Sequence, residues 1–319
     1  KREFSSMQAI VIDPQAPVRL GFQTVEPPIP QANEAVIQVK AISLNRGEVV
    51  YLVQGAAGTR LGWDLAGVVK QAAADGSGPA QGTRVVGVSM APPGAWAEQV
   101  AIPTNALAEL PPSVSFAQAA ALPVAGLTAL YAIEHGGSLI ARPVLITAAS
   151  GGVGFFACRL ASLAGAQVIG QVRQSSSASL VQEAGADHIV VDENIAAASE
   201  YGPYHLIIDQ LGGRTLAETM TQLAPGGTCV SIGAIAGDDV PLDRARVRQV
   251  PGASLDFFNL FFELRRESAS LGLQRLVHLV STGKLLPPIG MEADWHEISS
   301  VAQALIDRQF QGKAVLHIS

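Results

Sequence analysis

Apolar and polar positions between Pro143 and Arg173 follow the order strand, turn, helix, strand. Residues 144–148 are apolar or β-branched, as in a buried strand, and the run 149–154 consists mainly of small residues. Helical periodicity then leads to Gly165, and residues 168–172 form a second apolar run. This order predicts the βαβ unit of a dinucleotide-binding fold.

The later part of the chain continues the alternation of strands and helices. A helix is predicted over residues 216–223, and the expected strands cover residues 188–191, 206–209, 227–232 and 254–257. Such alternation predicts an α/β fold with a doubly wound parallel sheet that binds its ligand at the carboxyl ends of the strands.

The first part of the chain is rich in short strands separated by proline and glycine. The expected strands cover residues 8–12, 35–42, 65–69, 85–88 and 96–102. This spacing predicts a small, partly open β-barrel, followed by a helical stretch over residues 115–133.

The tail of the chain predicts helices over residues 263–282 and 298–308 and a closing strand over 313–318. We expect the closing strand to return to the first domain, which makes that domain discontinuous. The predicted dinucleotide-binding domain is 119–261, and the other domain combines 1–118 with 262–319. We expect residues 1–6, before Met7, to be a remnant of cloning.

The small-residue turn contains the strongest candidates for cofactor binding. Gly151 lets the backbone approach a pyrophosphate, and Gly154 lets helix and strand pack closely, although Ala149 replaces the first glycine of the usual motif. Free amides and the helix dipole favour phosphate charge at a helix start. A plain tight turn is the alternative. The residues expected to contact the cofactor are Ser150, Gly151, Gly152, Val153 and Gly154.

The end of the second strand predicts which nicotinamide cofactor is bound. NAD-binding folds place an acid about 20 residues beyond the motif, to bond the ribose 2′-hydroxyl. Here no acid occurs before Glu183, and Arg173 stands near the expected position, with Ser175 nearby. A guanidinium suits a 2′-phosphate, so we expect NADP; the alternative is a solvated surface arginine.

Composition and charge narrow the class of protein. The chain has 319 residues, 48% of them hydrophobic and 15% charged, which is typical of a compact enzyme of two domains. The net charge of −6, without a dense basic run, argues against a nucleic-acid partner. No apolar run reaches membrane-spanning length and no signal peptide is recognisable, so we expect no membrane association.

The metal-binding and redox residues are few. Cys158 and Cys229 are too few for a disulfide framework, and both are expected to be core residues. The six histidines show no metal-ligand spacing. We expect a reducing, cytoplasmic location and no metal site.

The sequence resembles the medium-chain dehydrogenase/reductase superfamily, and within it the zinc-free quinone oxidoreductase and enoyl reductase branch. The resemblance spans nearly the whole chain in the family's order and implies a GroES-like first domain beside the Rossmann-type domain. The matching segments are Ser43–Asn45, Gly62–Val69, Ala121–Ala129, Ala149–Gly154, Asp209–Gly213, Ser231–Gly233 and Gly312–Leu316.

The resemblance also implies which chemistry is absent. The first catalytic zinc ligand of the family, a cysteine, falls near Asn45-Arg46, and the histidine falls near Trp63-Asp64. The second catalytic cysteine and the four-cysteine lobe are absent too. Without thiolate or imidazole at these positions the donor set for catalytic zinc is lacking.

Further cofactor contacts follow from the resemblance. Thr128 matches a position that touches the nicotinamide side of the cofactor. Gly233 and Ala234 are expected to leave room for the ring, and Leu211 and Gly212 to flank the ribose.

Candidates for the reacting centre lie mainly in the first domain. Asn45 is expected to contact the cofactor or the substrate carbonyl, with a structural turn residue as the alternative. Tyr51 is a candidate proton donor, with pocket wall or core as the alternative. Trp63, Phe257 and Phe258 are expected to line an apolar substrate pocket, unless they are simply core.

The implied function is an NADPH-dependent reductase that transfers hydride to an α,β-unsaturated carbonyl or a quinone, both small electrophiles. Two alternatives remain: a biosynthetic enzyme acting on one tailored intermediate, which includes a non-redox cyclisation or isomerisation, and a cofactor-binding sensor without chemistry. By analogy with the family we expect a homodimer that pairs the strand at residues 254–257 across a two-fold axis.

Overall fold

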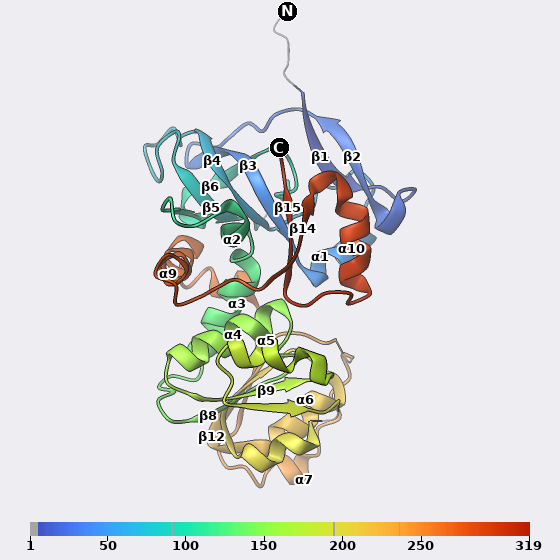
Figure 1. Cartoon of the computed structure of the whole chain (residues 1–319), viewed down its shortest axis with the longest axis vertical. Helices are drawn as coiled ribbons and strands as arrows, with labels where there is room; N and C mark the ends of the chain where they lie inside the picture. Colours follow the sequence, from blue (N-terminus) through green and yellow to red (C-terminus); the bar gives the residue numbers. More distant parts are fainter. Residues whose placement is uncertain (1–5, 91, 194, 236) are drawn as a thin grey trace, which may run out of the picture. The chain divides into compact units, whose positions relative to one another are not determined.

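A computed structural model describes residues 6–90, 92–193, 195–235 and 237–319. Residues 1–5 of the expected cloning remnant therefore lie outside the described part of the chain. The chain forms two compact units (Figure 1). Unit 1 comprises Lys1–Leu127 and Leu264–Ser319, and unit 2 comprises Thr128–Glu263. The division at Leu127 falls within helix α3 (Pro123–Glu134).

Unit 1 is built on strands, as the spacing of apolar runs predicts. A seven-stranded sheet has the order β14-β15-β3-β4-β5-β7, with β6 paired to β3, and β1 and β2 form a separate antiparallel pair. The strands of unit 1 are β1 (Met7–Ile12), β2 (Leu20–Val25), β3 (Glu34–Leu44), β4 (Asp64–Gln71), β5 (Arg84–Val88), β6 (Gln99–Pro103), β7 (Leu107–Glu109), β14 (Ile289–Asp294) and β15 (Lys313–His317).

The closing strand joins the first part of the chain. Strand β15 pairs antiparallel with β3, with Ala314 opposite Leu44 and His317 opposite Ala41. Strand β3 pairs with β4 as well and shifts register twice along that pair, and irregularities of this kind bend a sheet. The expected return of the last strand to the first domain is confirmed.

The helices of unit 1 include α1 (Arg46–Val50), α2 (Phe116–Ala120), α9 (Ala269–Ser281) and α10 (Ile298–Ile306). Two helix predictions were wrong in their bounds. The stretch 115–133 is divided into α2 and α3 because Pro123 lacks an N–H and begins a new helix. The predicted helix at 263–282 is α8 (Leu260–Glu263) followed by α9, because Ser268 takes an extended N-cap conformation that starts a new helix.

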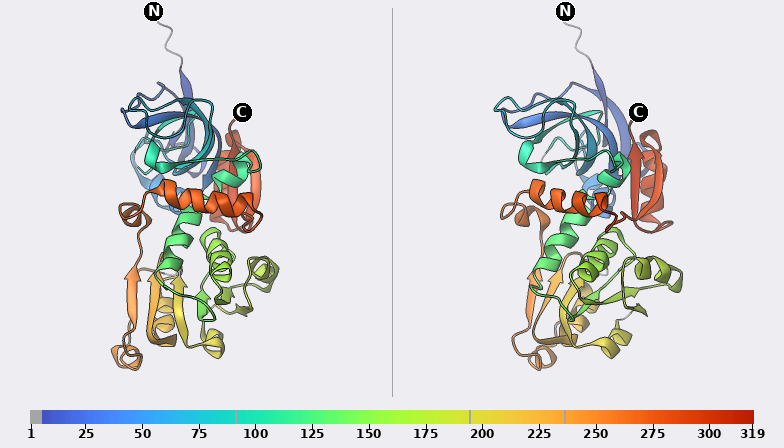
Figure 2. Two further views of the ribbon diagram at one scale, coloured as in Figure 1. Left: turned by 90° about the vertical axis from the view of Figure 1, so that its left-hand side faces the viewer. Right: turned by 60° about the vertical axis from the view of Figure 1, so that its left-hand side comes forward.

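Unit 2 contains the predicted parallel sheet, in the order β10-β9-β8-β11-β12-β13 (Figure 2). Every pair in it is parallel, and the chain turns outward in opposite directions from the junction of β8 and β11. This junction is the switch point at which doubly wound folds bind their ligands. The strands are β8 (Pro143–Ile146), β9 (Gln167–Val172), β10 (His188–Val191), β11 (Tyr204–Asp209), β12 (Leu223–Ser231) and β13 (Ser254–Phe257).

The helices of unit 2 connect successive strands. Helix α4 (Gly152–Leu163) joins β8 to β9, α5 (Ala178–Glu183) joins β9 to β10, and α6 (Gly213–Thr219) joins β11 to β12; α7 (Arg244–Val247) precedes β13. Right-handed crossovers on opposite sides of the switch point put α4 and α6 on opposite faces of the sheet. None of the helices in the described ranges is long and apolar enough to span a membrane.

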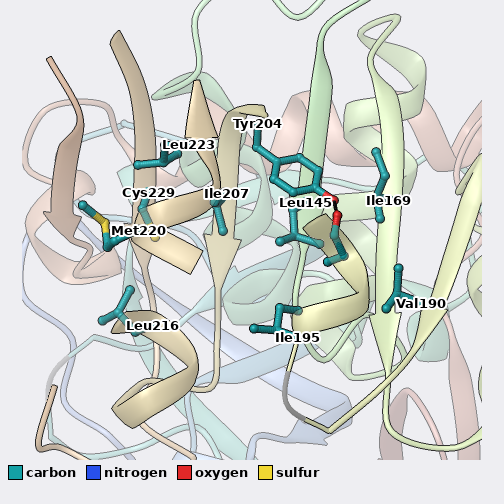
Figure 3. Packing of buried hydrophobic residues seen from close by; sticks show 11 residues of the cluster. Leu145, Ile169, Val190, Ile195, Tyr204, Ile207, Leu216, Met220, Leu223 and Cys229 are labelled. Carbon is teal, nitrogen blue, oxygen red and sulfur yellow. Dashed lines mark hydrogen bonds between the residues drawn. The ribbon is translucent and has the colours of Figure 1, made fainter. Parts of the chain in front are cut away.

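Side chains from the strands and helices of unit 2 form a closely packed core (Figure 3). Tyr204 is fully buried within it, and its hydroxyl donates a hydrogen bond to the backbone carbonyl of Ala198. Cys229 belongs to this core and Cys158 is buried in α4, so both cysteines are core residues as predicted. Burial raises the pKa of the Cys158 thiol to about 12, which keeps it protonated and unreactive.

Candidate active site

The turn between β8 and α4 begins with a strained residue. Ala148 has a left-handed backbone (φ 48°), and its carbonyl accepts the amide of Gly151 at 3.0 Å. A Cβ atom on Gly154 would lie 2.4 Å from that same carbonyl oxygen, so only glycine fits there. The close packing of helix and strand predicted for Gly154 is present in the structure.

The N-terminal amides of α4 provide the means to bind an anion. Gly151 is the N-cap and offers no side-chain acceptor, and within the described residues the amides of Gly152 and Val153 have no hydrogen-bond acceptor. Both residues and Ser150 are only half-buried. Unpaired amides and the positive end of the helix dipole suit a phosphate group, so the turn fits a dinucleotide.

The end of β9 carries the residues predicted to select NADP. Arg173 follows directly after β9, and Ser175 begins a short 3₁₀-helix, η4 (Ser175–Ser177). Both side chains are exposed. The arrangement presents a guanidinium and hydroxyls at the carboxyl end of the strand, where a 2′-phosphate is expected.

Asp209, at the end of β11, holds the next loop in place. Its carboxylate accepts the amide of Gly212 at 2.8 Å and the hydroxyl of Thr147 at 3.2 Å. Burial raises the pKa of Asp209 to about 6. Gly212 has a left-handed backbone (φ 68°), and a Cβ there would lie 2.8 Å from Cα of Ala234. Asp209 thus keeps the loop after β11 against the loop after β12.

The remaining predicted cofactor contacts of unit 2 lie on these same loops or on α3. Leu211, Gly233 and Ala234 are half-buried, and Thr128, on α3, is almost fully buried at 4% exposure. The structure therefore places the residues predicted at the ends of β8, β9, β11 and β12 at one edge of the sheet.

A second group of polar side chains lies inside unit 1 and is called here the polar cluster. It consists of Ser43, Asn45, Glu48, Asp64 and Lys313. Asp64 and Glu48 are completely buried and Lys313 is 3% exposed. Lys313 Nζ lies 3.1 Å from Asp64 Oδ2 and 2.6 Å from Asn45 Oδ1, and it donates to the carbonyl of Leu44 at 3.0 Å.

Asp64 is hydrogen-bonded through both carboxylate oxygens. Oδ2 accepts from Ser43 Oγ at 2.6 Å and from Asn45 Nδ2 at 2.8 Å, in addition to the ammonium of Lys313. Oδ1 accepts the amide of Val124 at 2.9 Å. This full set of donors is what a buried carboxylate requires.

Asn45 and Glu48 form a capping box at the start of α1. Glu48 accepts the Asn45 amide at 2.7 Å and the Trp63 amide at 2.6 Å. Burial and the charge of Asp64 raise the pKa of Glu48 to about 8, although Lys313 and the two amides act in the opposite direction. Glu48 therefore holds its proton to a higher pH than an exposed glutamate does.

The hydrogen bonds of Asn45 limit its chemistry. Nδ2 donates to Asp64 at 2.8 Å and to Glu48 at 3.1 Å, and Oδ1 accepts from Lys313. Both N–H groups of the amide are thus engaged, and the side chain of Asn45 also accepts the Glu48 amide in the capping box. Asn45 in this arrangement has no donor left for a substrate carbonyl.

The polar cluster does not fit a metal ion. Its carboxylates accept hydrogen bonds from neighbouring groups, and an ammonium group stands at its centre. No set of three or more His, Cys, Asp and Glu side chains in the described part of the chain is arranged to hold a metal. Zinc favours thiolate and imidazole, and Asn45 and Trp63 supply neither.

The other candidates for the reacting centre are divided between the two units. Tyr51 caps the end of α1 and is 66% exposed. The ring of Trp63 lies beside Gly47, because a Cβ atom built on Gly47 would be 3.5 Å from that ring. In unit 2, Phe257 is 72% exposed on β13, whereas the ring of Phe258 contacts His135 at 6.0 Å between centroids. The side chains of Phe257 and Phe258 therefore do not line the same wall of a substrate pocket.

Four functional or supporting residues were not predicted from the sequence: Glu48, Asp64, Lys313 and Gln171. Two signals were available. The spacing Asn45-x-x-Glu48 is that of a capping box, and Lys313 is a lone charge in an apolar closing strand.

Two family models match this chain. The model described as an alcohol dehydrogenase GroES-like domain matches residues 31–112, and the model described as a zinc-binding dehydrogenase matches residues 152–263. A quinone oxidoreductase of Pseudomonas aeruginosa is 30% identical over 232 residues, which cover 69% of this chain and 71% of that protein. The chain belongs to the medium-chain dehydrogenase/reductase superfamily, in its quinone oxidoreductase-like branch.

Two further proteins extend the comparison. The spectinabilin polyketide synthase system protein NorB of Streptomyces orinoci is 33% identical over 209 residues, or 62% of this chain, but this chain spans only 9% of that protein. A mycobacterial protein solved with NADPH has a TM-score of 0.87 at 24% identity, over 98% of this chain and 100% of its own. At that identity the likeness shows the shared fold.

Membership accounts for the two-unit architecture, and it makes the chain an oxidoreductase that uses a nicotinamide cofactor. The GroES-like match lies in unit 1 and includes Asn45, Glu48 and Asp64. The other match lies in unit 2 and begins at Gly152, inside the glycine turn. Although that family model is described as zinc-binding, the polar cluster and the rest of the described residues lack the donor set for zinc.

Proposed function

We propose that this chain is an NADPH-dependent, zinc-independent reductase that transfers hydride to an activated C=C bond of an α,β-unsaturated carbonyl, or to a quinone. The observation that carries the proposal is the position of the Lys313 ammonium group in the polar cluster. This group lies 3.1 Å from Asp64 and 2.6 Å from Asn45, and the cluster lacks the donor set for zinc. Carbonyl reduction by Lewis-acid polarisation needs a metal donor set. An electron-poor alkene or quinone accepts hydride without one.

The cofactor supplies the hydride when it is bound. The turn residues from Ser150 to Gly154 provide amides for the pyrophosphate, and Arg173 with Ser175 provides charge and hydroxyl donors for the 2′-phosphate. The loops at Leu211 and at Gly233-Ala234 are proposed to flank the ribose and the nicotinamide, and Thr128 to contact the nicotinamide side.

Protonation completes the reduction of an enone, because hydride addition at the β-carbon leaves an enolate. Tyr51 is the proposed proton donor, since it is 66% exposed. Asn45 is proposed to contact the cofactor. Trp63, Phe257 and Phe258 stay candidates for the apolar substrate contacts.

One comparison favours a biosynthetic substrate as the second candidate. NorB is a polyketide synthase system protein, and 62% of this chain matches 9% of NorB. An enzyme of this kind acts on one tailored intermediate, so it would bind NADPH and yet be slow with simple enones and quinones.

The proposal includes a homodimer. Strand β13 pairs with β12 and lies at the end of the sheet, and Phe257 on it is 72% exposed. An open edge with an exposed aromatic side chain suits pairing with a second copy. Light scattering at micromolar concentration should give twice the mass of one chain, and the mass of one chain would refute the dimer.

The function is tested by NADPH oxidation with a panel of enones and quinones, followed by product analysis. The proposal predicts consumption of NADPH together with the saturated ketone or the quinol. A folded sample that binds NADPH but consumes none with any member of the panel would contradict it.

A further inference from the structure

The side chain of Gln171 lies buried beneath the cofactor turn. Gln171 is on β9, the strand between β8 and β10, and is 2% exposed. A carboxamide in such a place needs partners for both its carbonyl and its amino group. Its partners come from two different loops.

The carbonyl of the Gln171 side chain binds the start of the glycine turn. Oε1 accepts the backbone amide of Ala148 at 2.9 Å, and the backbone carbonyl of Gln171 accepts the amide of Ala149, also at 2.9 Å. One residue of β9 therefore holds two successive amides of the turn.

The amino group of the Gln171 side chain binds the segment after β10. Nε2 donates to the backbone carbonyl of Asp192, the residue after β10, and the amide of Asp192 donates to Val172 at 3.1 Å. The carboxylate of Asp192 accepts the amide of Ala197 at 3.0 Å. Gln171 thus joins the carboxyl ends of β8, β9 and β10.

The residue that Gln171 holds is the strained one. Ala148 has φ 48°, a conformation that residues with a Cβ rarely adopt, and its carbonyl accepts the amide of Gly151. The conformation of Ala148 consequently sets the direction in which the amides of Gly152 and Val153 point. Such strain persists only where neighbouring contacts impose it.

We propose that Gln171 is a positioning residue of the cofactor site: it fixes Ala148 in its left-handed conformation and links the pyrophosphate-binding turn to the segment after β10. This inference rests on the proposed role of the turn in NADPH binding. Gln171 acts through the backbone of the turn and has no direct contact with the reacting atoms.

The test compares Gln171→Met with the wild type. Methionine keeps the length of the side chain and removes both hydrogen bonds, which leaves the Ala148 amide without its acceptor. We expect the Kd for NADPH and the KM for NADPH to rise about tenfold, because a buried donor without a partner makes the bound form of the turn less stable. The kcat at saturating NADPH should change less than twofold.

Thr219→Val is the matched control. Thr219 is fully buried in the same unit, and its hydroxyl donates to the carbonyl of Leu216 within α6, away from the turn. We expect this variant to lower the melting temperature and to leave the KM for NADPH unchanged. A folded Gln171→Met protein whose Kd and KM stay within twofold of wild type would overturn the inference.

Gln171→Glu supplies a second test that holds even where the methionine variant does not fold. A protonated carboxyl group can accept from Ala148 and donate to Asp192, whereas a carboxylate faces the Asp192 carbonyl with a lone pair. The Kd for NADP⁺ of this variant, divided by that of wild type at the same pH, should rise several-fold from pH 5.5 to pH 8. A ratio near one throughout would refute the proposed role.

Cofactor binding by the wild type distinguishes failure of the proposed function from failure of the positioning role. If the wild type binds neither NADPH nor NADP⁺, the proposed function fails whatever Gln171 does. If the wild type binds the cofactor and both Gln171 variants bind equally well, only the positioning role fails.

Discussion

The ammonium group of Lys313 lies 3.1 Å from the carboxylate of Asp64, although 249 positions separate the two residues in the sequence. The pair joins β15, from the tail of the chain, to β4, from its first part. Asn45, Ser43 and Glu48 complete the hydrogen bonds around this pair. The polar cluster therefore ties the discontinuous unit 1 together around the residues proposed to be near the chemistry.

Replacement of Lys313 tests the importance of this pair for stability. Lys313→Met removes the only cation that contacts Asp64 among the described residues and leaves this buried carboxylate without a counter-ion. We expect the free energy of unfolding to fall by about 3–5 kcal/mol. Lys70→Met, at an exposed position on β4, should change it by less than about 0.5 kcal/mol in the same denaturation experiment.

Glu48 should give the stability a measurable pH dependence. Its pKa is raised from 4.5 to about 8 in the folded protein, so between these values the folded state holds a proton that the unfolded chain releases. The contribution of Glu48 to stability is therefore present below pH 4.5 and is lost as the pH rises to 8.

The variant Glu48→Gln cannot titrate and isolates this effect. The comparison is made between pH 6.5 and 8, which lies above the pKa of about 6 of Asp209. In this range the free energy of unfolding of the wild type should fall, relative to that of the variant, by up to about 1.4 kcal/mol per pH unit. Chemical denaturation at several pH values measures the difference. Parallel curves for the two proteins would show that Glu48 stays ionised throughout.

Arg173 should determine the choice of nicotinamide cofactor. Arg173→Asp replaces an exposed guanidinium with a carboxylate that repels a 2′-phosphate, so the Kd for NADPH should rise by about 100-fold and the Kd for NADH by less than threefold. Titration calorimetry measures both constants. Arg248→Asp makes the same charge change at an exposed position before β13 and should affect neither. Equal losses for NADPH and NADH in Arg173→Asp would remove the phosphate role.

Tyr51 is tested as the proton donor by Tyr51→Phe. Because the side chain is 66% exposed, the variant should fold with an unchanged melting temperature. The kcat for an enone should fall about 100-fold if the hydroxyl supplies the proton to the enolate. A fall of less than threefold would mean that water supplies it.

The sequence predicts unit 2 more completely than the polar cluster, for a physical reason. Local apolar runs specify the buried parallel strands β8, β9 and β11, and the edge strands β10 and β13 also have the bounds that the sequence predicts. Strands β2 and β14 were not predicted, since β14 alternates half-buried and exposed positions instead of forming an apolar run. Pro123 and Ser268, each at the start of a new helix, lie within longer helical patterns of the sequence.

The polar cluster depends on contacts that no local pattern shows. Lys313 meets Asp64 only after β15 pairs with β3 and β3 with β4. Gln171 is a buried polar residue among the apolar residues of β9, and its role emerges only with the left-handed Ala148 beside it. The glycine turn itself was predictable because the residues that form it are contiguous.

The most direct test of the proposed chemistry is the rate of NADPH oxidation with an enone or quinone, measured before and after exhaustive treatment with a zinc chelator. We predict consumption of NADPH with formation of one equivalent of reduced product, at a rate that neither the chelator nor added zinc changes. Activity that the chelator abolishes and zinc restores would contradict the account, as would NADPH binding without oxidation in the presence of either acceptor.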